Sequence, residues 1–201
     1  MRPRRHLIVF ARAPMLGIGK RRLAREIGDL AALRFELLML ARLLRRIGRD
    51  RRWRLRLALT SHHARYRRRL WPPRTPVITQ GEGDLGGRMR RVLAACLPGP
   101  AVLVGSDIPA LGPRHIAQAF RLLGRHDVVF GPAQDGGFWL VGARGSQRLQ
   151  ALFTKVRWSS PHALADALAS LPPQVSVGLA ATLEDVDDAE AYRRLAPRRG
   201  F

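Results

Sequence analysis

The stretch Ala101-Val102-Leu103-Val104-Gly105-Ser106-Asp107-Ile108-Pro109 decides how this chain is organised. Four small apolar residues indicate a buried strand, and the carboxylate of Asp107 follows just past its end. In open α/β sheets, ligands bind outside the carboxyl ends of the strands. Asp107 is therefore placed to hold a metal ion against phosphates, in a protein rich in cationic residues. The alternative is a plain turn, because Asp-x-Pro commonly opens a loop after a strand.

Apolar runs and helical periodicities alternate on both sides of this strand. We expect strands at 6–11, 55–60, 77–79, 101–106, 128–130, 138–141 and 175–177. We expect one long helix after residue 20 that Gly48 closes, and helices at 84–97, 113–123, 146–153, 161–171 and 189–195. This order predicts a single α/β domain over residues 1–201, with a core of about 6–195. Its architecture would be a three-layer sandwich, with helices on both faces of a mostly parallel sheet.

Composition narrows the class of protein. At 201 residues with 46% hydrophobic content, the chain can form a well-buried globular domain. Its single cysteine, Cys96, excludes an internal disulfide and a cysteine metal cluster. No apolar run approaches the roughly 20 residues that span a bilayer. We therefore expect a soluble cytoplasmic protein without a transmembrane segment; the oligomeric state is open.

The formal net charge of +21 suggests a polyanionic partner or substrate. The cations are nearly all arginines spread along the helices, and only Lys20 and Lys155 are lysines. The sequence has neither an aromatic-interleaved RNA-binding strand nor zinc-finger spacing. An arginine-rich coding bias explains the charge equally well. We expect weak, nonspecific attraction to polyanions and no specific binding of nucleic acid.

The loop Arg12-Ala13-Pro14-Met15-Leu16-Gly17-Ile18-Gly19-Lys20 joins the first strand to a helix, where backbone amides and the helix dipole favour an anion. Gly17 and Gly19 would let the backbone approach a phosphate, and Lys20 would add a point charge. The loop matches neither the P-loop nor the dinucleotide-binding pattern. The alternative is a tight turn with a solvated lysine.

A second glycine-rich passage, Gly81-Glu82-Gly83-Asp84-Leu85-Gly86-Gly87-Arg88-Met89, opens the helix expected at 84–97. Its glycines suit a backbone that lies flat against a base or ribose, with Gly83 and Gly86 in contact. Asp84 is a nucleotide contact or an ordinary helix N-cap. Arg88, in the first turn, reaches a phosphate or stays in solvent.

Three later segments carry further candidates. Asp135, before Gly136 and Gly137, is either a base beside the acceptor or part of a hairpin turn, for which Asp-Gly is a common signal. Trp158, followed by two serines before a helix, is either an acceptor-site residue or a core residue next to an N-cap. An acidic run late in the chain either supplies a second oxygen ligand for a divalent ion or lies at a helix N-terminus, where acidic residues are favourable. The run is Glu184-Asp185-Val186-Asp187-Asp188.

The motifs together resemble a known group. The order is F-A-R-A-P-x-x-G-x-G-K-x-R-L-A, G-D-L-G-x-R-M, G-S-D-I-P-x-L, G-P-A-x-D-G-G-F-W-L-V-G and D-V-D. It is similar to a bacterial family of GT-A-like transferases in the nucleotide-diphospho-sugar transferase superfamily, formerly a domain of unknown function. Some members are labelled arsenosugar biosynthesis glycosyltransferases, and the guanylyltransferase of coenzyme F420 synthesis is a more distant relative. The resemblance spans about residues 6–195.

The resemblance implies roles for particular positions. Asp107 falls where such folds keep a metal-binding carboxylate, and Asp187 matches a late aspartate that some relatives use as second ligand. The first nucleotide-binding loop would include Ala11, Arg12, Pro14, Gly17, Gly19 and Lys20. This chain departs from the pattern at Arg21 and Asp188, where relatives often have threonine, and at Phe138 and Trp139, which replace tyrosines.

These observations predict a metal-dependent transferase that uses a nucleotide-activated substrate. The resemblance favours a glycosyltransferase that moves a sugar from a nucleotide-diphospho-sugar to a small-molecule acceptor. The alternatives are a nucleotidyltransferase that uses a nucleoside triphosphate and releases pyrophosphate, and a non-catalytic nucleotide- or polyanion-binding protein. Mg²⁺ or Mn²⁺ is the expected cofactor. Asp107, Lys20 and Asp135 are the predicted catalytic residues.

Overall fold

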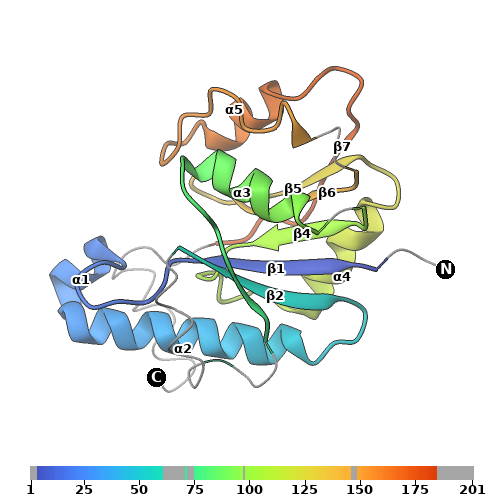
Figure 1. Cartoon of the computed structure of the whole chain (residues 1–201). Helices are drawn as coiled ribbons and strands as arrows, with labels where there is room; N and C mark the ends of the chain where they lie inside the picture. The colour runs from blue at the N-terminus through green and yellow to red at the C-terminus, as the bar shows by residue number, and fades with distance from the viewer. Residues whose placement is uncertain (1–3, 61–70, 72–74, 97, 146–148, 185–201) are drawn as a thin grey trace.

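The computed structural model describes residues 4–60, 71, 75–96, 98–145 and 149–184 (Figure 1). Within these ranges a seven-stranded sheet has the order β3-β2-β1-β4-β6-β5-β7. The strands are β1 (His6–Ala11), β2 (Arg54–Leu59), β3 (Val77–Thr79), β4 (Ala101–Val104), β5 (Val128–Pro132), β6 (Phe138–Ala143) and β7 (Val177–Leu179). The predicted α/β class and mostly parallel sheet are confirmed.

One strand runs against the others. β1 is parallel to β2 and β4, β2 to β3, and β5 to β7, whereas β6 is antiparallel to both β4 and β5. A short hairpin turn between β5 and β6 forces this reversal, because parallel neighbours need a long crossover connection. The start of β6 therefore meets the carboxyl end of β4, where Val104 pairs with Leu140.

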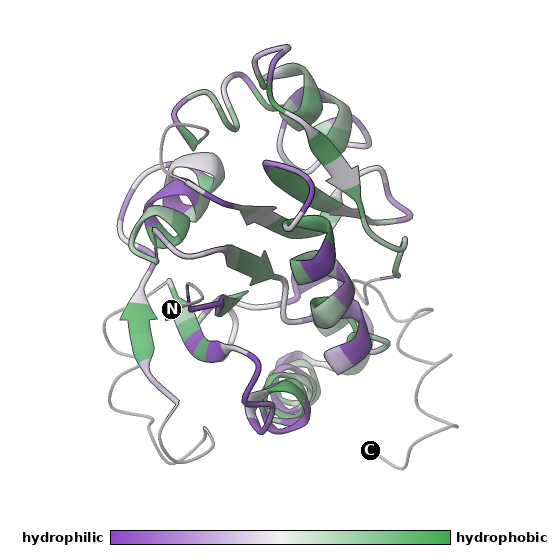
Figure 2. Cartoon of the chain, turned by 90° about the vertical axis from the view of Figure 1, so that its right-hand side faces the viewer, coloured by the Kyte–Doolittle hydropathy of each residue, from purple (hydrophilic) through white to green (hydrophobic). Residues whose placement is uncertain are grey.

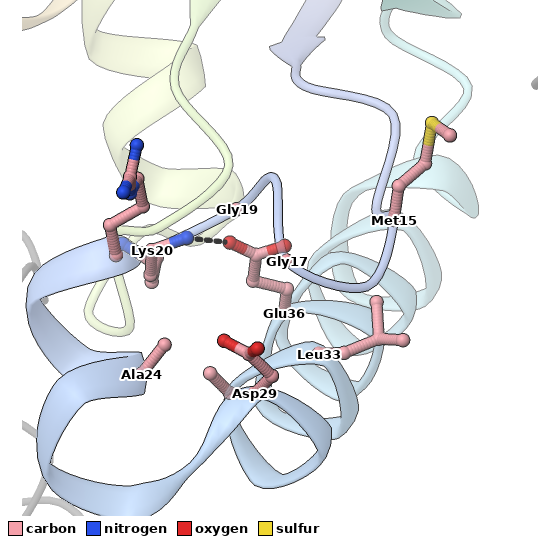
Figure 3. Close-up of a pocket in the computed structure, with 10 residues that line it drawn as sticks. Met15, Gly17, Gly19, Lys20, Ala24, Asp29, Leu33 and Glu36 are labelled. Carbon is pink, nitrogen blue, oxygen red and sulfur yellow. Dashed lines mark hydrogen bonds between the residues drawn. The ribbon is translucent and has the colours of Figure 1, made fainter.

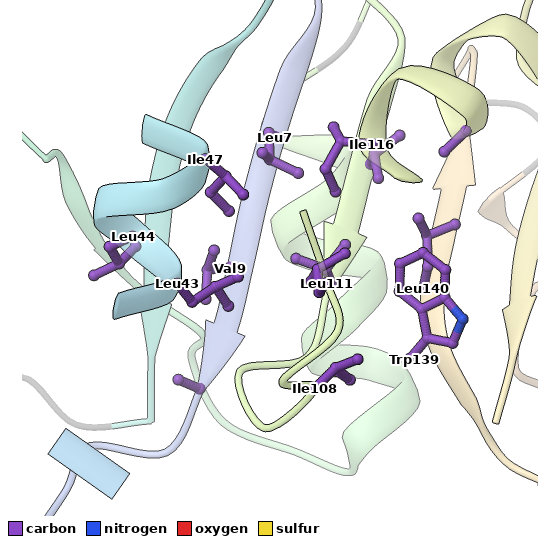
Figure 4. Packing of buried hydrophobic residues seen from close by; sticks show 14 of the residues in the cluster. Leu7, Val9, Leu43, Leu44, Ile47, Ile108, Leu111, Ile116, Trp139 and Leu140 are labelled. Carbon is purple, nitrogen blue, oxygen red and sulfur yellow. The ribbon is translucent and has the colours of Figure 1, made fainter. Parts of the chain in front are cut away.

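Helices cover both faces of the sheet and form two hydrophobic layers (Figures 1 and 2). The helices are α1 (Arg21–Ile27), α2 (Asp29–Gly48), α3 (Leu85–Ala94), α4 (Pro113–Leu122) and α5 (Ala163–Ala169). α2 and α4 pack on the face to which β1 contributes Leu7 and Val9 (Figure 4). α3 and α5 pack on the other face, to which β1 contributes Ile8. This alternation follows from the two-residue period of a strand.

The expected long helix after residue 20 is two helices. Gly28, which has φ +83° and ψ 154°, separates α1 from α2. L-residues with side chains avoid that backbone region, whereas glycine adopts it readily. The periodicity of α2 is otherwise as predicted, and its buried residues are Ala32, Phe35, Met39, Leu40, Leu43, Leu44 and Ile47.

Two other expectations need correction. The described part of the segment 146–153 contains no α-helix, and Phe153 has a left-handed φ of 73° that an α-helix does not allow. The last strand lies two residues later than expected, at Val177–Leu179. The helix expected at 189–195 lies outside the described residues. No helix in the described ranges is long and apolar enough to cross a membrane.

Candidate active site

Three of the candidate segments, which carry Lys20, Asp107 and Asp135, lie at one edge of the sheet, beyond the carboxyl ends of the parallel strands β1, β4 and β5. The loop at residues 12–20 leaves β1 at this edge, and Asp107 follows β4. The β5–β6 turn reaches the same edge, since the Gly105 amide donates to the carbonyl of Trp139 at the start of β6 (3.0 Å). This is the edge where open α/β sheets bind their ligands.

The centre of the site is a contact between the two loops. The ammonium Nζ of Lys20 lies 3.1 Å from Oδ2 of Asp107. The exposed fractions of the two side chains are 11% for Lys20 and 34% for Asp107. The contact brings together two residues that stand 87 positions apart and that the sequence singled out separately. This contact is compatible with both alternatives for Asp107, so its role as a metal ligand stays a prediction.

The loop that carries Asp107 is fixed at both sides. Ile108 and Leu111 are buried in the layer formed with α2 and α4 (Figure 4). Arg46 of α2 donates from Nη1 to the carbonyl oxygens of Pro109 and Leu111, each at 2.8 Å. The carboxylate of Asp107 therefore projects from a loop that is held by packing on one side and by a cation on the other.

Glu36 is a site residue that the sequence interpretation missed. Its Oε1 accepts a hydrogen bond of 2.6 Å from the backbone amide of Lys20 (Figure 3). A side-chain carbon at Gly19 would overlap this carboxylate, so glycine is needed there for the approach of Glu36. The signal was present in the sequence, because Glu36 stands three residues after Leu33 and four before Leu40, in the apolar register of α2.

A small pocket lies between this loop and the first turns of α1 and α2 (Figure 3). Glu36 is one of its lining residues, and the loop beside it turns at Gly17, which has φ +75°. The lining residues are Met15, Gly17, Gly19, Lys20, Arg21, Ala24, Asp29, Ala32, Leu33 and Glu36. Of the other predicted loop residues, Ala13 and Pro14 are buried and Arg12 is exposed.

The second glycine-rich passage has structural roles. Asp84 is the N-cap of α3 and accepts from the Gly87 amide (2.6 Å), one of the two alternatives. Arg88 donates from Nη1 to Oε1 of Gln80 (3.1 Å) instead of extending into solvent. Gly83 has φ +101°, and nothing lies within 4 Å of where its side chain would be. The predicted nucleotide contacts of Gly83, Asp84 and Arg88 stay predictions.

Gln80 was also missed by the sequence interpretation. It is fully buried at the end of β3, and its Nε2 donates to the carbonyls of Ala11 (2.8 Å) and Ala58 (3.0 Å). Buried polar groups are costly unless they are bonded, and here the amide joins the ends of β1 and β2. A lone glutamine after a three-residue strand gives no sequence signal for such a role.

Three of the predicted acceptor-side residues, Asp135, Gly136 and Gly137, lie in the β5–β6 turn. Oδ1 of Asp135 accepts from the Gly137 amide (2.9 Å), and the Ala133 amide donates to the Gly137 carbonyl (3.0 Å). Gly136 has φ +83°, and a side chain there would overlap the carbonyl oxygen of Pro161. These contacts match the hairpin alternative. Asp135 is exposed at the ligand-binding edge, so its role as a base stays a prediction.

Trp158 belongs to an aromatic cluster. Its ring meets the rings of Phe138 and Phe153 edge-on, with centroids 6.2 and 5.5 Å apart. Gly86 lies against this cluster, since a side-chain carbon there would be 2.7 Å from Cβ of Phe153. The two serines do not cap α5 as expected, because its N-cap is His162 and no side chain caps it. The structure thus gives Trp158 and Gly86 packing roles.

The chain returns to the same edge after β7. Ala180 and Leu183 donate to the carbonyls of Phe130 and Pro132, at 2.8 and 3.1 Å, so residues 180–183 run alongside β5. Nε1 of Trp139 donates to the carbonyl of Ala181 (3.0 Å) and fixes this segment. The predicted second metal ligand, Asp187, lies outside the described residues.

Of the two predicted metal ligands, Asp107 and Asp187, only Asp107 lies among the described residues. It already faces a cationic group, the Lys20 ammonium, at the ligand-binding edge. Within the described ranges, no three His, Cys, Asp or Glu residues gather in a way that could hold a metal ion. Mg²⁺ sites in phosphate-transfer proteins commonly use one or two carboxylates and complete the shell with phosphates and water. The single carboxylate of Asp107 therefore fits a cation that is bound together with a phosphorylated substrate.

Comparison with known proteins assigns the chain to a family. Residues 43–160, more than half of its length, match the family described as "Uncharacterized protein conserved in bacteria (DUF2064)". The chain belongs to this family. No curated protein matches the sequence.

Solved structures of other proteins share the fold of this chain. A candidate nucleotide-diphospho-sugar transferase from Desulfovibrio desulfuricans G20 is 21% identical, with a TM-score of 0.81 over 98% of this chain and 89% of that one. Rv0371c from Mycobacterium tuberculosis H37Rv, in complex with manganese, is 20% identical, with a TM-score of 0.58 over 97% and 99%. CMP:2-keto-3-deoxy-manno-octonic acid synthetase, complexed with CTP, is 11% identical, with a TM-score of 0.59 over 96% and 97%. The resemblance drawn from the motifs is confirmed for family and fold.

Proposed function

We propose that this protein is a transferase that binds a nucleotide-diphospho-sugar at the carboxyl edge of the sheet and moves the sugar to a small-molecule acceptor. The contact between Lys20 Nζ and Asp107 Oδ2 carries this proposal. A plain anion-binding protein gains nothing from a carboxylate beside its phosphate site, because the two negative charges repel. A cation placed between carboxylate and phosphate removes that repulsion.

In this proposal Lys20 and Asp107 have different roles in binding the diphosphate. Lys20 supplies a positive charge to the diphosphate, and its side chain is already at the ligand-binding edge. Asp107, with Asp187 as the predicted second ligand, would hold Mg²⁺ or Mn²⁺. Such a cation, when bound, neutralises the charge that develops on the leaving diphosphate. Catalysis would then consist largely of positioning and electrostatic stabilisation.

The acceptor side is assigned to the β5–β6 turn. In sugar transfer, an acceptor oxygen forms a bond to C1 of the sugar, the bond from C1 to the diphosphate oxygen breaks, and the acceptor proton passes to a base. Asp135 is our candidate for that base. Asp135→Asn keeps an oxygen that can accept from the Gly137 amide, so it preserves the turn and removes only the basicity. It should lower kcat about 100-fold or more, with little change in melting temperature; unchanged kcat would leave Asp135 as a turn residue only.

A second candidate is nucleotidyl transfer, in which the acceptor attacks the α-phosphorus and pyrophosphate leaves. The observation that favours it is the similarity in fold to cytidylyltransferases and nucleotidyltransferases, with TM-scores of 0.58 to 0.60. The candidate nucleotide-diphospho-sugar transferase fits better, at 0.81. Sugar transfer is therefore the leading proposal.

A ligand screen separates the two chemistries. The protein would be melted with a panel of nucleotide sugars and nucleoside triphosphates, with and without Mn²⁺, since a ligand that binds only the folded state raises the melting temperature. We expect a nucleotide-sugar hit that requires Mn²⁺, followed by release of nucleoside diphosphate when an acceptor is found. Hits among triphosphates alone would favour nucleotidyl transfer, and no hit in either class would contradict both.

A further inference from the structure

The two charged residues of the site are both anchored to one helix, α2. Glu36 holds the backbone amide of Lys20 (2.6 Å). Arg46, ten residues later on the same helix, holds the carbonyls of Pro109 and Leu111 (both 2.8 Å), directly after Asp107. α2 itself is fixed to the sheet by its buried apolar residues, which include Leu40, Leu43, Leu44 and Ile47.

The Glu36 anchor has an unusual chemistry for a phosphate-binding loop. Amides of such loops ordinarily point at the ligand's phosphate oxygens, yet the Lys20 amide donates to a carboxylate of the protein. The short distance is typical of a charge-assisted hydrogen bond. The carboxylate reaches this amide because residue 19 is glycine. With its backbone fixed by Glu36, Lys20 offers its ammonium group, rather than its amide, to the site.

Arg46 fixes the loop that follows Asp107 in a similar way. One guanidinium nitrogen bridges two carbonyls of the loop 108–111, and the burial of Ile108 and Leu111 fixes the opposite side of that loop. The loop cannot shift along the sheet edge without breaking both bonds or exposing both apolar side chains. Asp107 directly precedes residues 108–111, so the position of its backbone is restricted as well.

We propose that α2 is the positioning element of the site, with Glu36 and Arg46 as positioning residues that hold Lys20 and Asp107 at the spacing needed for a cation-bound diphosphate. This inference rests on the proposed function. Small displacements of such groups have large effects, because positioning contributes much of the catalysis in transfer reactions. Neither residue needs to touch the substrate.

The direction in which a Glu36 substitution changes nucleotide affinity distinguishes a positioning role from a simple charge effect. Glu36→Ala removes a negative charge beside the diphosphate site, so long-range electrostatics alone would strengthen nucleotide binding without metal and would not weaken binding of the Mn²⁺ complex. Positioning predicts the opposite: a weakening of at least tenfold in the Kd of the Mn²⁺-nucleotide complex. Glu36→Gln, which retains an oxygen acceptor for the Lys20 amide, should stay within about threefold of the wild type. Glu26→Ala, which removes an exposed acid of α1 outside the residues that line the pocket, is the matched charge control and should not weaken binding.

The positioning role of Arg46 is tested by comparing nucleotide binding in variants of Arg46 and of its neighbour Arg45. Arg46→Ala should weaken the same complex at least tenfold, whereas Arg45→Ala, which removes the same charge from an exposed position on the same turn, should leave it within about threefold. Arg46→Lys, with a cation that can reach one carbonyl, should fall between the two. Circular dichroism and melting temperature exclude variants that do not fold.

A measurement without nucleotide completes the test. Amide hydrogen exchange in the unliganded protein should show faster exchange around residue 20 in Glu36→Ala than in the wild type or Glu36→Gln. If the wild type binds no Mn²⁺-nucleotide, the proposed function fails and this inference fails with it. If the wild type binds and Glu36→Ala and Arg46→Ala bind equally well or better, only the positioning role is overturned. Unchanged exchange around residue 20 in Glu36→Ala would also overturn the Glu36 anchor.

Discussion

The ion pair of Lys20 and Asp107 is the smallest unit on which the proposed function depends. A partly exposed ion pair contributes only about 0–1 kcal/mol to stability, so folding alone gives little reason for it. Only two of the chain's 36 Lys and Arg residues are lysines; Lys155 lies in a turn, and Lys20 lies in the candidate site. Its flexible ammonium group can move from a carboxylate to a phosphate, which the planar arginine fork does less easily.

A substitution at Lys20 should therefore act in opposite directions on two ligands. In Lys20→Gln, Mn²⁺ alone should bind Asp107 more tightly, because the competing ammonium is gone, whereas the nucleotide should bind at least tenfold more weakly. Electron paramagnetic resonance of Mn²⁺ and calorimetry of the nucleotide measure the two effects. Arg21→Gln, which removes the adjacent charge, is the control for general electrostatics. Parallel changes in both affinities for Lys20→Gln would argue against the competition.

At the scale of elements, Gln80 joins the strand ends that carry the site. Its amide bonds to the ends of β1 and β2, and its oxygen accepts from Arg88 of α3. Gln80→Met, of similar size, should lower the free energy of unfolding by about 1–3 kcal/mol, because buried polar partners lose their bonds. Urea denaturation measures the loss. Gln134→Met, the same change at an exposed position, should be nearly neutral; an equal loss there would point to a general effect of methionine.

The start of α4 gives the fold a pH dependence. The pKa of His115 is lowered, first by burial and then by repulsion from Arg114. Its Nδ1 accepts from the Gly112 amide (3.1 Å), which a proton on that nitrogen would prevent. The unfolded chain therefore takes up this proton more readily, and the stability gained from the neutral ring is complete above the ordinary pKa of about 6.5 and lost as the pH falls below it.

This dependence can be isolated by substitution. The free energy of unfolding should drop between pH 7.5 and pH 5 in the wild type, and His115→Gln should show a smaller drop. His162→Gln, at an exposed histidine, should behave as the wild type. If His115→Gln kept the full pH dependence, other groups would account for it.

Elements with strong local signals could be predicted from the sequence, and those that depend on tertiary contacts could not. β1, β3 and β4 follow from short apolar runs, and α4 from its first-turn proline. The break at Gly28 was hidden inside a continuous helical period. The segment around Phe153 forms a turn because its ring packs among other aromatic rings, which periodicity does not reveal.

The site shows the same division. Lys20 and Asp107 could be singled out because each stands in a recognisable motif that follows a strand. Gln80 could not be singled out, because its side chain bonds to a residue 69 positions away, and Glu36 was missed because its place in the apolar register of α2 does not reveal a partner 16 positions away. The glycines at 86 and 136 illustrate the converse, since close packing against Phe153 and Pro161 explains them without a ligand.

On the scale of the whole molecule, family, fold and site agree. The chain belongs to the DUF2064 family, shares its fold with nucleotide-using transferases, and brings Lys20 and Asp107 together at one edge of the sheet. The net charge of +21 favours anionic ligands in general, so weak binding of polyanions is not by itself support for the proposal. The requirement for a cation at Asp107 is the specific claim.

Calorimetric titration of the best nucleotide ligand into wild type and Asp107→Asn, each with Mn²⁺ and with a chelator, tests that claim most directly. We predict that the wild type binds at least tenfold more tightly with Mn²⁺ than without it, and that Asp107→Asn loses this gain while its melting temperature stays close to that of the wild type. Equal affinity in the two proteins, with or without Mn²⁺, would contradict the account.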